Sequence, residues 1–439
     1  MDWKKKHDPA KGNKENAGSC GKRIKESCSR MLQDEQNGER LYLVALIGYL
    51  AISMWATTTF PMTDRMAKLS RLPFLGLVAL KILLYDHYRL KPLVVMAFSG
   101  ASVMLAFISS SNSVIPATMM MIAGTRGVSF KKILQTYLIL VGGIMALAFA
   151  ASLLGVIENL QYVTESRGIR NSFGIVYTTD FAAHMFYLVM IFFYLKGESL
   201  RAWHYILTLA LSGLVYYFCN ARLDSTSIAL VAILFAIGNG VLSGRYTSQR
   251  LRRLWTRGWE VAGPWILPAM AAFSIVVTAT YQEGNALLDA FEKESGRRIG
   301  MGKEAMEEYG IKLFGQYIEM VGNGGTTERQ GSEYFFLDCS YVNIFMRFGV
   351  IVMLLVTILY VYSCCKNRHD QYFLYTIALL AFNCLIAHHL LEMAYNPFNL
   401  ALFASCVRNP RTRTARQKAG AAGASSQTRG LDRRPASLF

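Results

Sequence analysis

The stretch ILQTYLILVGGIMALAFAASLLGVI, residues 133–157, decides the fold class of this chain. It contains no charged residue, and an α-helix of this length crosses the roughly 30 Å hydrocarbon core of a membrane. Similar apolar runs occupy residues 41–60, 90–108 and 350–362. Runs of this length and composition predict transmembrane helices.

The composition extends this interpretation to the whole chain. Of the 439 residues, 53% are hydrophobic and only 17% are charged, whereas soluble domains carry about a quarter charged residues. We therefore exclude a soluble enzyme, a disordered chain and a collagen-like chain. The eight cysteines do not form a disulfide framework, and their spacing indicates no metal or redox site.

We predict an all-α polytopic membrane protein with about twelve transmembrane helices, in a range of about 10 to 13. Two of the predicted segments, 113–124 and 396–406, are short. The others are 41–59, 72–87, 92–110, 133–157, 177–195, 203–219, 226–243, 261–280, 341–363 and 371–387.

The distribution of charge predicts the orientation. The net charge is +17, and most of the 46 lysines and arginines lie in the two tails and in loops that an inside N-terminus places in the cytoplasm. Cytoplasmic loops of membrane proteins carry such an excess, so we expect both termini to be cytoplasmic. Because no basic stripe interleaved with aromatic residues accompanies the charge, we expect no nucleic-acid partner.

Three parts of the chain follow from this topology. We expect residues 1–40 to be a disordered, basic cytoplasmic tail. We expect residues 41–406 to form a multi-spanning membrane domain. Within that domain, residues 281–340 form one long extracytoplasmic loop with a short helix, and loops of this length are typically functional or disordered. Residues 407–439 predict a second basic, low-complexity cytoplasmic tail that contacts membrane lipids.

The most informative residues are ionisable groups near the outer ends of the predicted helices. Such groups are costly in hydrocarbon, so they normally face a partner, a bundle interior or a water-filled cavity. They form four clusters along the sequence: Arg167 with Arg170, Arg222 with Asp224, Arg297 with Arg298, and Asp338 with His388, His389 and Glu392.

Arginine suits the recognition of a diphosphate. Its planar guanidinium donates bidentate hydrogen bonds to phosphate oxygens and stays charged when partly desolvated. Several arginines converging beside a carboxylate at the outer leaflet would therefore suit a lipid-diphosphate leaving group. The alternative for each arginine is contact with lipid head groups or an ion pair, which for Arg222 would be with Asp224.

A carboxylate or an imidazole could supply the general base. Asp338 is a candidate because a base must lie within hydrogen-bond reach of the attacking hydroxyl. Alternatively, Asp338 or Ser340 caps the helix that follows. His389 and Glu392 are rival bases, although His388 and His389 could also be polar groups at the membrane interface.

At these motifs the sequence resembles bacterial O-antigen and capsular polysaccharide polymerases of the Wzy type and, more distantly, the O-antigen ligases. The resemblance covers residues 41–405. Its motifs are Arg170-Asn-Ser-Phe-Gly174, Asn220-Ala-Arg222, Gly296-Arg-Arg298, Leu313-Phe-Gly-Gln316, Asp338-Cys-Ser-Tyr341 with Gly349, and His389 with Asn396-Pro-Phe398.

The resemblance implies a glycosyltransferase of the bacterial cytoplasmic membrane. Such an enzyme needs neither metal nor cofactor and joins undecaprenyl-diphosphate-linked oligosaccharide repeat units at the outer leaflet, for O-antigen, capsule or exopolysaccharide. By the same resemblance, Arg170, Arg222 and Arg298 would hold the diphosphate, and Asp338, His389 or Glu392 would be catalytic. We expect Arg167, which is in the same cluster as Arg170, to contribute to diphosphate binding as well. A flippase and a chain-length regulator would be its partners.

Two other functions remain open from the sequence. An O-antigen-type ligase would use the same donor with another acceptor. A flippase or other transporter would carry charged or interrupted helices at the membrane midplane and internal repeats. The charges of this chain gather at one face instead, which favours the transferase.

Overall fold

The computed structural model describes residues 35–86, 90–164, 168–244, 247–322, 325 and 334–406. The predicted tail 407–439, residues 1–34 of the other tail and Arg167 lie outside the described residues.

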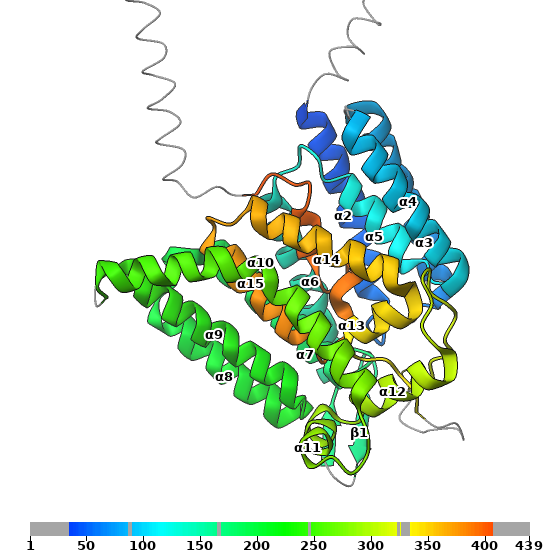
Figure 1. The fold of residues 1–439 in the computed structure, drawn as a ribbon, viewed down its shortest axis with the longest axis vertical. Helices are drawn as coiled ribbons and strands as arrows, with labels where there is room; N and C mark the ends of the chain where they lie inside the picture. The colour runs from blue at the N-terminus through cyan, green and yellow to red at the C-terminus, as the bar shows by residue number, and fades with distance from the viewer. Residues whose placement is uncertain are drawn as a thin grey trace, which may run out of the picture.

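The described chain is mostly helical (Figure 1). Its helices are α2 Glu35–Trp55, α3 Asp64–Tyr85, α4 Leu90–Ser110, α5 Val114–Ala123, α6 Phe130–Leu153, α7 Thr178–Lys196, α8 Ala202–Cys219, α9 Arg222–Ser243, α10 Gln249–Thr280, α11 Ala286–Ser295, α12 Arg298–Tyr309, α13 Ser340–Asn343, α14 Gly349–Lys366 and α15 Gln371–Asn383.

Seven helices of the described chain are long and apolar enough to cross a membrane. They are the helix from Leu93 to Ser110, α6, α7 with the turn after it, α8, α9, α10, and the continuous stretch Ser340–Lys366. Helices α2, α3, α5 and α15 occupy other predicted segments, but α5 and α15 have only 10 and 13 residues, too few to span a bilayer alone. The seven spans confirm a helical polytopic membrane protein.

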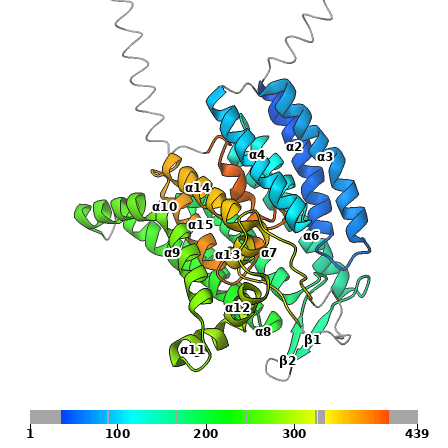
Figure 2. The ribbon, with the colours of Figure 1, turned by 45° about the vertical axis from the view of Figure 1, so that its right-hand side comes forward.

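The structure differs from the sequence prediction at several places before α13. Helix α2 begins at Glu35, inside the predicted tail. The predicted loop 281–340 contains two helices, α11 and α12. A small antiparallel hairpin, β1 Gln161–Thr164 and β2 Gly168–Asn171, precedes α7 and pairs Tyr162 with Arg170. Figure 2 shows the hairpin and α11 at the same end of the bundle.

The predicted twelfth helix, 396–406, is wrong. After α15 the chain forms only two short 3-10 turns, η3 His389–Leu391 and η4 Pro397–Ala401. Proline lacks an N–H to continue a helical ladder, and the Asn396 side chain accepts from the Phe398 N–H instead. This irregular segment, 384–406, is drawn in orange and red between the helices in Figure 1.

Segment 384–406 runs through the protein from one end of the bundle to the other. Near its start, His389 lies beside Asp180 in the first turn of α7, and near its end Ser405 pairs with Ser129, just before α6. Irregular backbone is tolerated at membrane depth only where it is buried in protein. Most of residues 389–404 are accordingly buried.

Side chains of the surrounding helices and of the segment itself satisfy part of the backbone of this segment. Tyr137 donates from its hydroxyl to the carbonyls of Ala394 and Tyr395, at 2.5 and 2.7 Å. Other donors to its carbonyls are Thr118 to Leu391, Ser340 to Ala387, Asn396 and Asn399 to Leu390, and Lys366 to Leu402 and Ala404. These side chains thus replace hydrogen bonds that a regular helix would have made through its backbone.

A second irregularity lies between α13 and α14. A π-helical turn, η2 Ile344–Phe348, ends at Gly349, whose φ is +89°. Residues 312–316 cross here: the Gln316 N–H donates to the Arg347 carbonyl at 3.0 Å, and the Val350 and Ile351 N–H groups donate to residues 312 and 313. A Cβ on Gly315 would lie 2.2 Å from the Arg347 oxygen, so only glycine fits this crossing.

The importance of the buried donors can be tested on two tyrosines. Replacing Tyr137 with phenylalanine leaves two buried carbonyls without their hydrogen-bond donor. Each carbonyl left unpaired lowers the free energy of unfolding by about 1–3 kcal/mol. Tyr187 is the matched control because its buried hydroxyl has no hydrogen-bond partner in the described chain. Thermal unfolding of the purified protein should show a clear loss for Tyr137→Phe and little change for Tyr187→Phe; equal effects would contradict this account of segment 384–406.

Candidate functional site

Six ionisable side chains form one continuous network at the end of the bundle that carries the hairpin and α12. They come from four parts of the chain: Asp180 from α7, Arg298 from α12, Asp338 from the residues before α13, and the trio His388, His389 and Glu392 from the start of segment 384–406. We call these six residues the charge network.

Acidic and basic groups alternate along the charge network. An Arg298 guanidinium nitrogen lies 3.4 Å from Asp338, and the other Asp338 oxygen lies 3.9 Å from Nδ1 of His388. Glu392 bridges the histidines, with one oxygen 3.3 Å from His388 Nε2 and the other 3.3 Å from His389 Nδ1. Nε2 of His389 lies 3.8 Å from Asp180. Each anion therefore lies beside at least one basic group.

Local structure fixes Arg298 at the start of α12. The Glu292 carboxylate accepts from the N–H groups of Ile299 and Gly300, at 3.0 and 3.1 Å, and thereby caps the first turn. The Arg298 side chain also donates to the Ser295 carbonyl. Its Nε is buried without a hydrogen-bond partner in the described chain, which leaves a donor for a ligand.

Asp338 is not a helix cap, which corrects one of the two roles the sequence left open. The residue before α13 is Cys339, and no side chain caps this helix. The Ser340 hydroxyl instead donates to the Ala387 carbonyl at 2.5 Å. The Asp338 carboxylate, about one fifth exposed, faces Arg298 and His388.

Aromatic stacking holds His389 in place. The Tyr395 ring lies between His389 and His184, with ring centroids 3.7 and 4.0 Å away. Nε2 of His184 lies 3.2 Å from the Thr57 hydroxyl. His389 is only 3% exposed, so the structure does not support a role for it as a polar group at the membrane interface.

His388, His389 and Glu392 lie outside the seven candidate spans. The pKa of each differs from its ordinary value. Burial lowers the pKa of His388 to about 4. Burial acts in the same direction on His389, but the hydrogen bond and charge of Glu392 outweigh it and raise the pKa of His389. Burial would raise the pKa of Glu392, yet the charges of His388 and His389 lower it to about 2.

The same trio could hold a metal ion. One ligand atom from each of His388, His389 and Glu392 lies within 4.8 Å of the others. Imidazole and carboxylate are ligands of zinc and of other transition metals. The observed ion pairs satisfy these atoms without a metal, because each histidine already faces Glu392 at 3.3 Å.

Arg170 and Arg222 lie beside the turn between α8 and α9. Nε of Arg170, on β2, donates to the Cys219 carbonyl at 3.0 Å. Arg222 is exposed at the start of α9. The alternative role of Arg222, an ion pair with Asp224, is not found among the described residues, because Asp224 is buried and accepts from Asn383 at 3.2 Å.

Two further charged residues, Asp180 and Arg347, lie in this region and were not predicted from the sequence. Asp180 lies in the first turn of α7. Arg347 lies in η2, with its Nε buried and without a hydrogen-bond partner in the described chain, and its charge acts on Glu392. Each is a lone charge inside a predicted membrane segment, the kind of residue that normally faces a partner.

The chain matches no family model, no curated protein and no solved structure.

The pH dependence of stability tests the charge network. In Glu392→Gln the anion that raises the pKa of His389 is lost, at a cost of about 2 kcal/mol for a hydrogen bond between charged groups. Because the pKa of His389 is higher in the folded than in the unfolded protein, its protonation stabilises the fold fully at pH values below the unfolded pKa, near 6.5. This stabilisation is lost as the pH rises through the pKa of His389 in the folded protein. The difference in unfolding temperature between parent and variant should therefore be largest near pH 6 and shrink toward pH 9.

Glu283→Gln is the control for this experiment, because Glu283 is exposed and lies outside the charge network. It removes the same charge and should leave the unfolding temperature nearly unchanged at every pH. A difference between parent and Glu392→Gln that does not depend on pH would contradict the pairing of Glu392 with His389.

Proposed function

We propose that this protein is a membrane glycosyltransferase that joins undecaprenyl-diphosphate-linked oligosaccharide units into a polysaccharide. The observation that carries the proposal is the position of Asp338, 3.4 Å from the Arg298 guanidinium and 3.9 Å from His388. Arg298 and Asp338 belong to two of the motifs that resemble the polysaccharide polymerases, and His388 directly precedes His389, which belongs to a third. The three residues are far apart in the sequence.

The chemistry of the transfer needs two kinds of group. The bond between the donor sugar C1 and the diphosphate oxygen breaks, and a bond forms between C1 and an acceptor hydroxyl oxygen. Guanidinium groups stabilise the negative charge that develops on the leaving diphosphate, and a base takes the acceptor proton. Arg298 and Arg347, each with a buried Nε that lacks a partner in the described chain, suit the first role.

Asp338 suits the role of the base better than its two rivals. Both ring nitrogens of His389 face carboxylates, and its raised pKa favours the cation. Glu392, with a pKa of about 2, holds a proton too weakly. The Asp338 carboxylate accepts no hydrogen bond from any described residue, because its two neighbours are only within ion-pair range.

The proposal places the charge network at the outer leaflet of a bacterial cytoplasmic membrane. Basic residues at the opposite end of the bundle support this orientation: Lys132 lies beside Glu39 near the start of α2, and Lys366 binds the end of segment 384–406. Cytoplasmic ends of membrane proteins carry such an excess. A charge network at one end of the bundle also favours a transferase over a transporter, whose site would lie near the midplane.

The proposed base can be tested with Asp338→Asn, which keeps the side-chain size but cannot take a proton. Purified protein supplied with lipid-linked repeat units, in the presence of a chelator, should form polymer, and the variant should be slower by about 10²–10⁴-fold. The control is Asp64→Asn, at an exposed carboxylate in the first turn of α3. A variant within about threefold of the parent would rule out Asp338 as the base.

The product distinguishes the two transferases. Chains of repeat units support the polymerase, whereas a single transfer to another acceptor would identify a ligase. Failure of the parent to consume the lipid-linked donor, with the chelator present or absent, would overturn the proposal.

The diphosphate contact can be tested on two adjacent arginines. Arg298→Lys keeps the charge but removes the planar fork, and should weaken donor binding and turnover by about tenfold. Arg297→Lys is the matched control, because Arg297 is exposed and pairs with none of the six network residues. Donor binding and turnover should be measured for both variants; equal values would show that Arg298 does not bind the diphosphate.

A further inference from the structure

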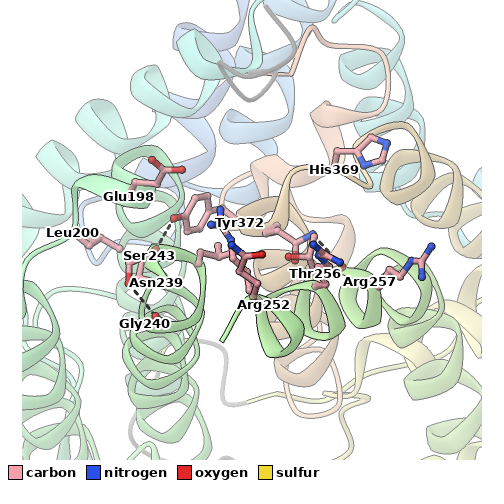
Figure 3. Close-up of a pocket in the computed structure, with 14 residues that line it drawn as sticks. Glu198, Leu200, Asn239, Gly240, Ser243, Arg252, Thr256, Arg257, His369 and Tyr372 are labelled. Atoms are coloured by element: carbon pink, nitrogen blue, oxygen red, sulfur yellow. Dashed lines mark hydrogen bonds between the residues drawn. The ribbon is translucent and has the colours of Figure 1, made fainter. Parts of the chain in front are cut away.

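A large open cavity lies at the opposite end of the bundle from the charge network. Its volume is 1360 Å³, and it is lined by residues of the turn after α7, the end of α9, the start of α10 and the start of α15. Figure 3 shows Glu198, Leu200 and Asn239 on one side of it and Thr256 and Arg257 on the other. We call it the basic cavity.

Three arginines from two successive turns of α10 give the basic cavity its charge. They are Arg252, Arg253 and Arg257, and Glu198 is the single acidic residue of the lining. None of the three forms an ion pair with another described residue. His369, also in the lining, is paired with Glu260 at 2.9 Å. The cavity therefore presents uncompensated guanidinium groups, which suit a phosphate.

The wall of the basic cavity also offers a buried acceptor. Gln371, at the start of α15, is 6% exposed, and its Oε1 is buried without a hydrogen-bond partner in the described chain. Its amide nitrogen is directed at the Thr256 carbonyl, at 3.5 Å. An amide oxygen accepts but cannot donate, so a ligand that satisfies it must bring a hydroxyl or an N–H group.

Neighbouring contacts make this wall rigid. Asn239 donates to the Gly197 carbonyl and to the Tyr205 hydroxyl, at 3.0 and 2.8 Å, and accepts from the Tyr372 hydroxyl at 2.5 Å. Asp370 caps α15 by accepting from the Phe373 N–H at 3.1 Å. Asn239 and Tyr372 are therefore occupied by their neighbours, whereas Oε1 of Gln371 has no hydrogen-bond partner among the described residues.

The first turns of α10 combine the arginines with apolar side chains. Leu251 and Leu254 are 51% and 60% exposed, and Leu200 and Leu242 line the cavity itself. A helix with basic and apolar faces is typical of the boundary between lipid head groups and acyl chains. The cavity thus has an apolar surface beside its phosphate-binding groups.

We propose that the basic cavity binds a glycerol phosphate group, with the phosphate on Arg252, Arg253 and Arg257 and a glycerol hydroxyl donating to Gln371. The group belongs either to an anionic phospholipid such as phosphatidylglycerol or to a soluble glycerol phosphate. This site is separate from the charge network and does not depend on the proposed transferase activity.

Calorimetric titration of the purified full chain in neutral detergent tests the proposal. The probes are dihexanoyl phosphatidylglycerol, dihexanoyl phosphatidylcholine and glycerol 3-phosphate. Phosphatidylglycerol should bind at least about tenfold more tightly than phosphatidylcholine, which has no glycerol hydroxyl and no net charge. Tighter binding of phosphatidylglycerol than of glycerol 3-phosphate identifies the lipid as the source, and the reverse order identifies the soluble compound.

Variants locate the binding. The double change Arg253→Gln with Arg257→Gln should weaken it by about tenfold or more, while Arg250→Gln, on the same helix but outside the cavity lining, should leave it within about twofold. Gln371→Met removes the acceptor and should weaken binding by about threefold. Unchanged affinity in the double variant with an unchanged unfolding temperature, or equal affinity for the two phospholipids, would overturn the proposal.

Discussion

Segment 384–406 crosses the bundle without a regular helix, so its backbone needs hydrogen-bond partners from side chains. A chain that passes irregularly through an apolar bundle must find a partner for each buried carbonyl and N–H group. The hydroxyl of Tyr137, the amides of Asn396 and Asn399 and the ammonium of Lys366 supply these partners. Because these groups replace a helix, His388, His389 and Glu392 can point toward one another inside the protein.

The crossing at Gly315 and Gly349 plays the matching role for the other half of the charge network. The segment around Leu313 donates and accepts backbone hydrogen bonds where η2 ends and α14 begins. It thereby ties the region after α12, which carries Arg298, to the helix that follows Asp338. Two breaks in regular structure thus bring an arginine, a carboxylate and a histidine pair together from separate parts of the sequence.

Much of the fold follows from the sequence alone, because long apolar runs such as 133–157 determine helices by composition. The sequence does not reveal that 396–406 crosses without a helix, since hydropathy counts apolar residues and ignores how Asn396 and Asn399 bond the backbone. Hydropathy also gives no signal for the small hairpin that precedes α7.

For the candidate site, the sequence identified the ionisable residues but not all of their partners. Arg298, Asp338, His389 and Glu392 were predicted to be functional and do lie in one network. Asp180 and Arg347 were overlooked because one charge hardly changes the mean hydropathy of a long apolar segment. The sequence left open an ion pair of Arg222 with Asp224, and the structure shows Asp224 bonded to Asn383 instead. Such contacts depend on tertiary packing, which spacing along the chain does not encode.

We propose that Arg298 and Asp338 mark the place where a lipid diphosphate is bound and its sugar transferred. The most direct test is an experimental structure of the full chain in a lipid nanodisc with undecaprenyl diphosphate. We expect density for the diphosphate against the guanidinium groups of Arg298 and Arg347, with the Asp338 carboxylate left free for an acceptor hydroxyl. Diphosphate bound only at the basic cavity, or at the turn between α8 and α9 with no contact to Arg298, would contradict it.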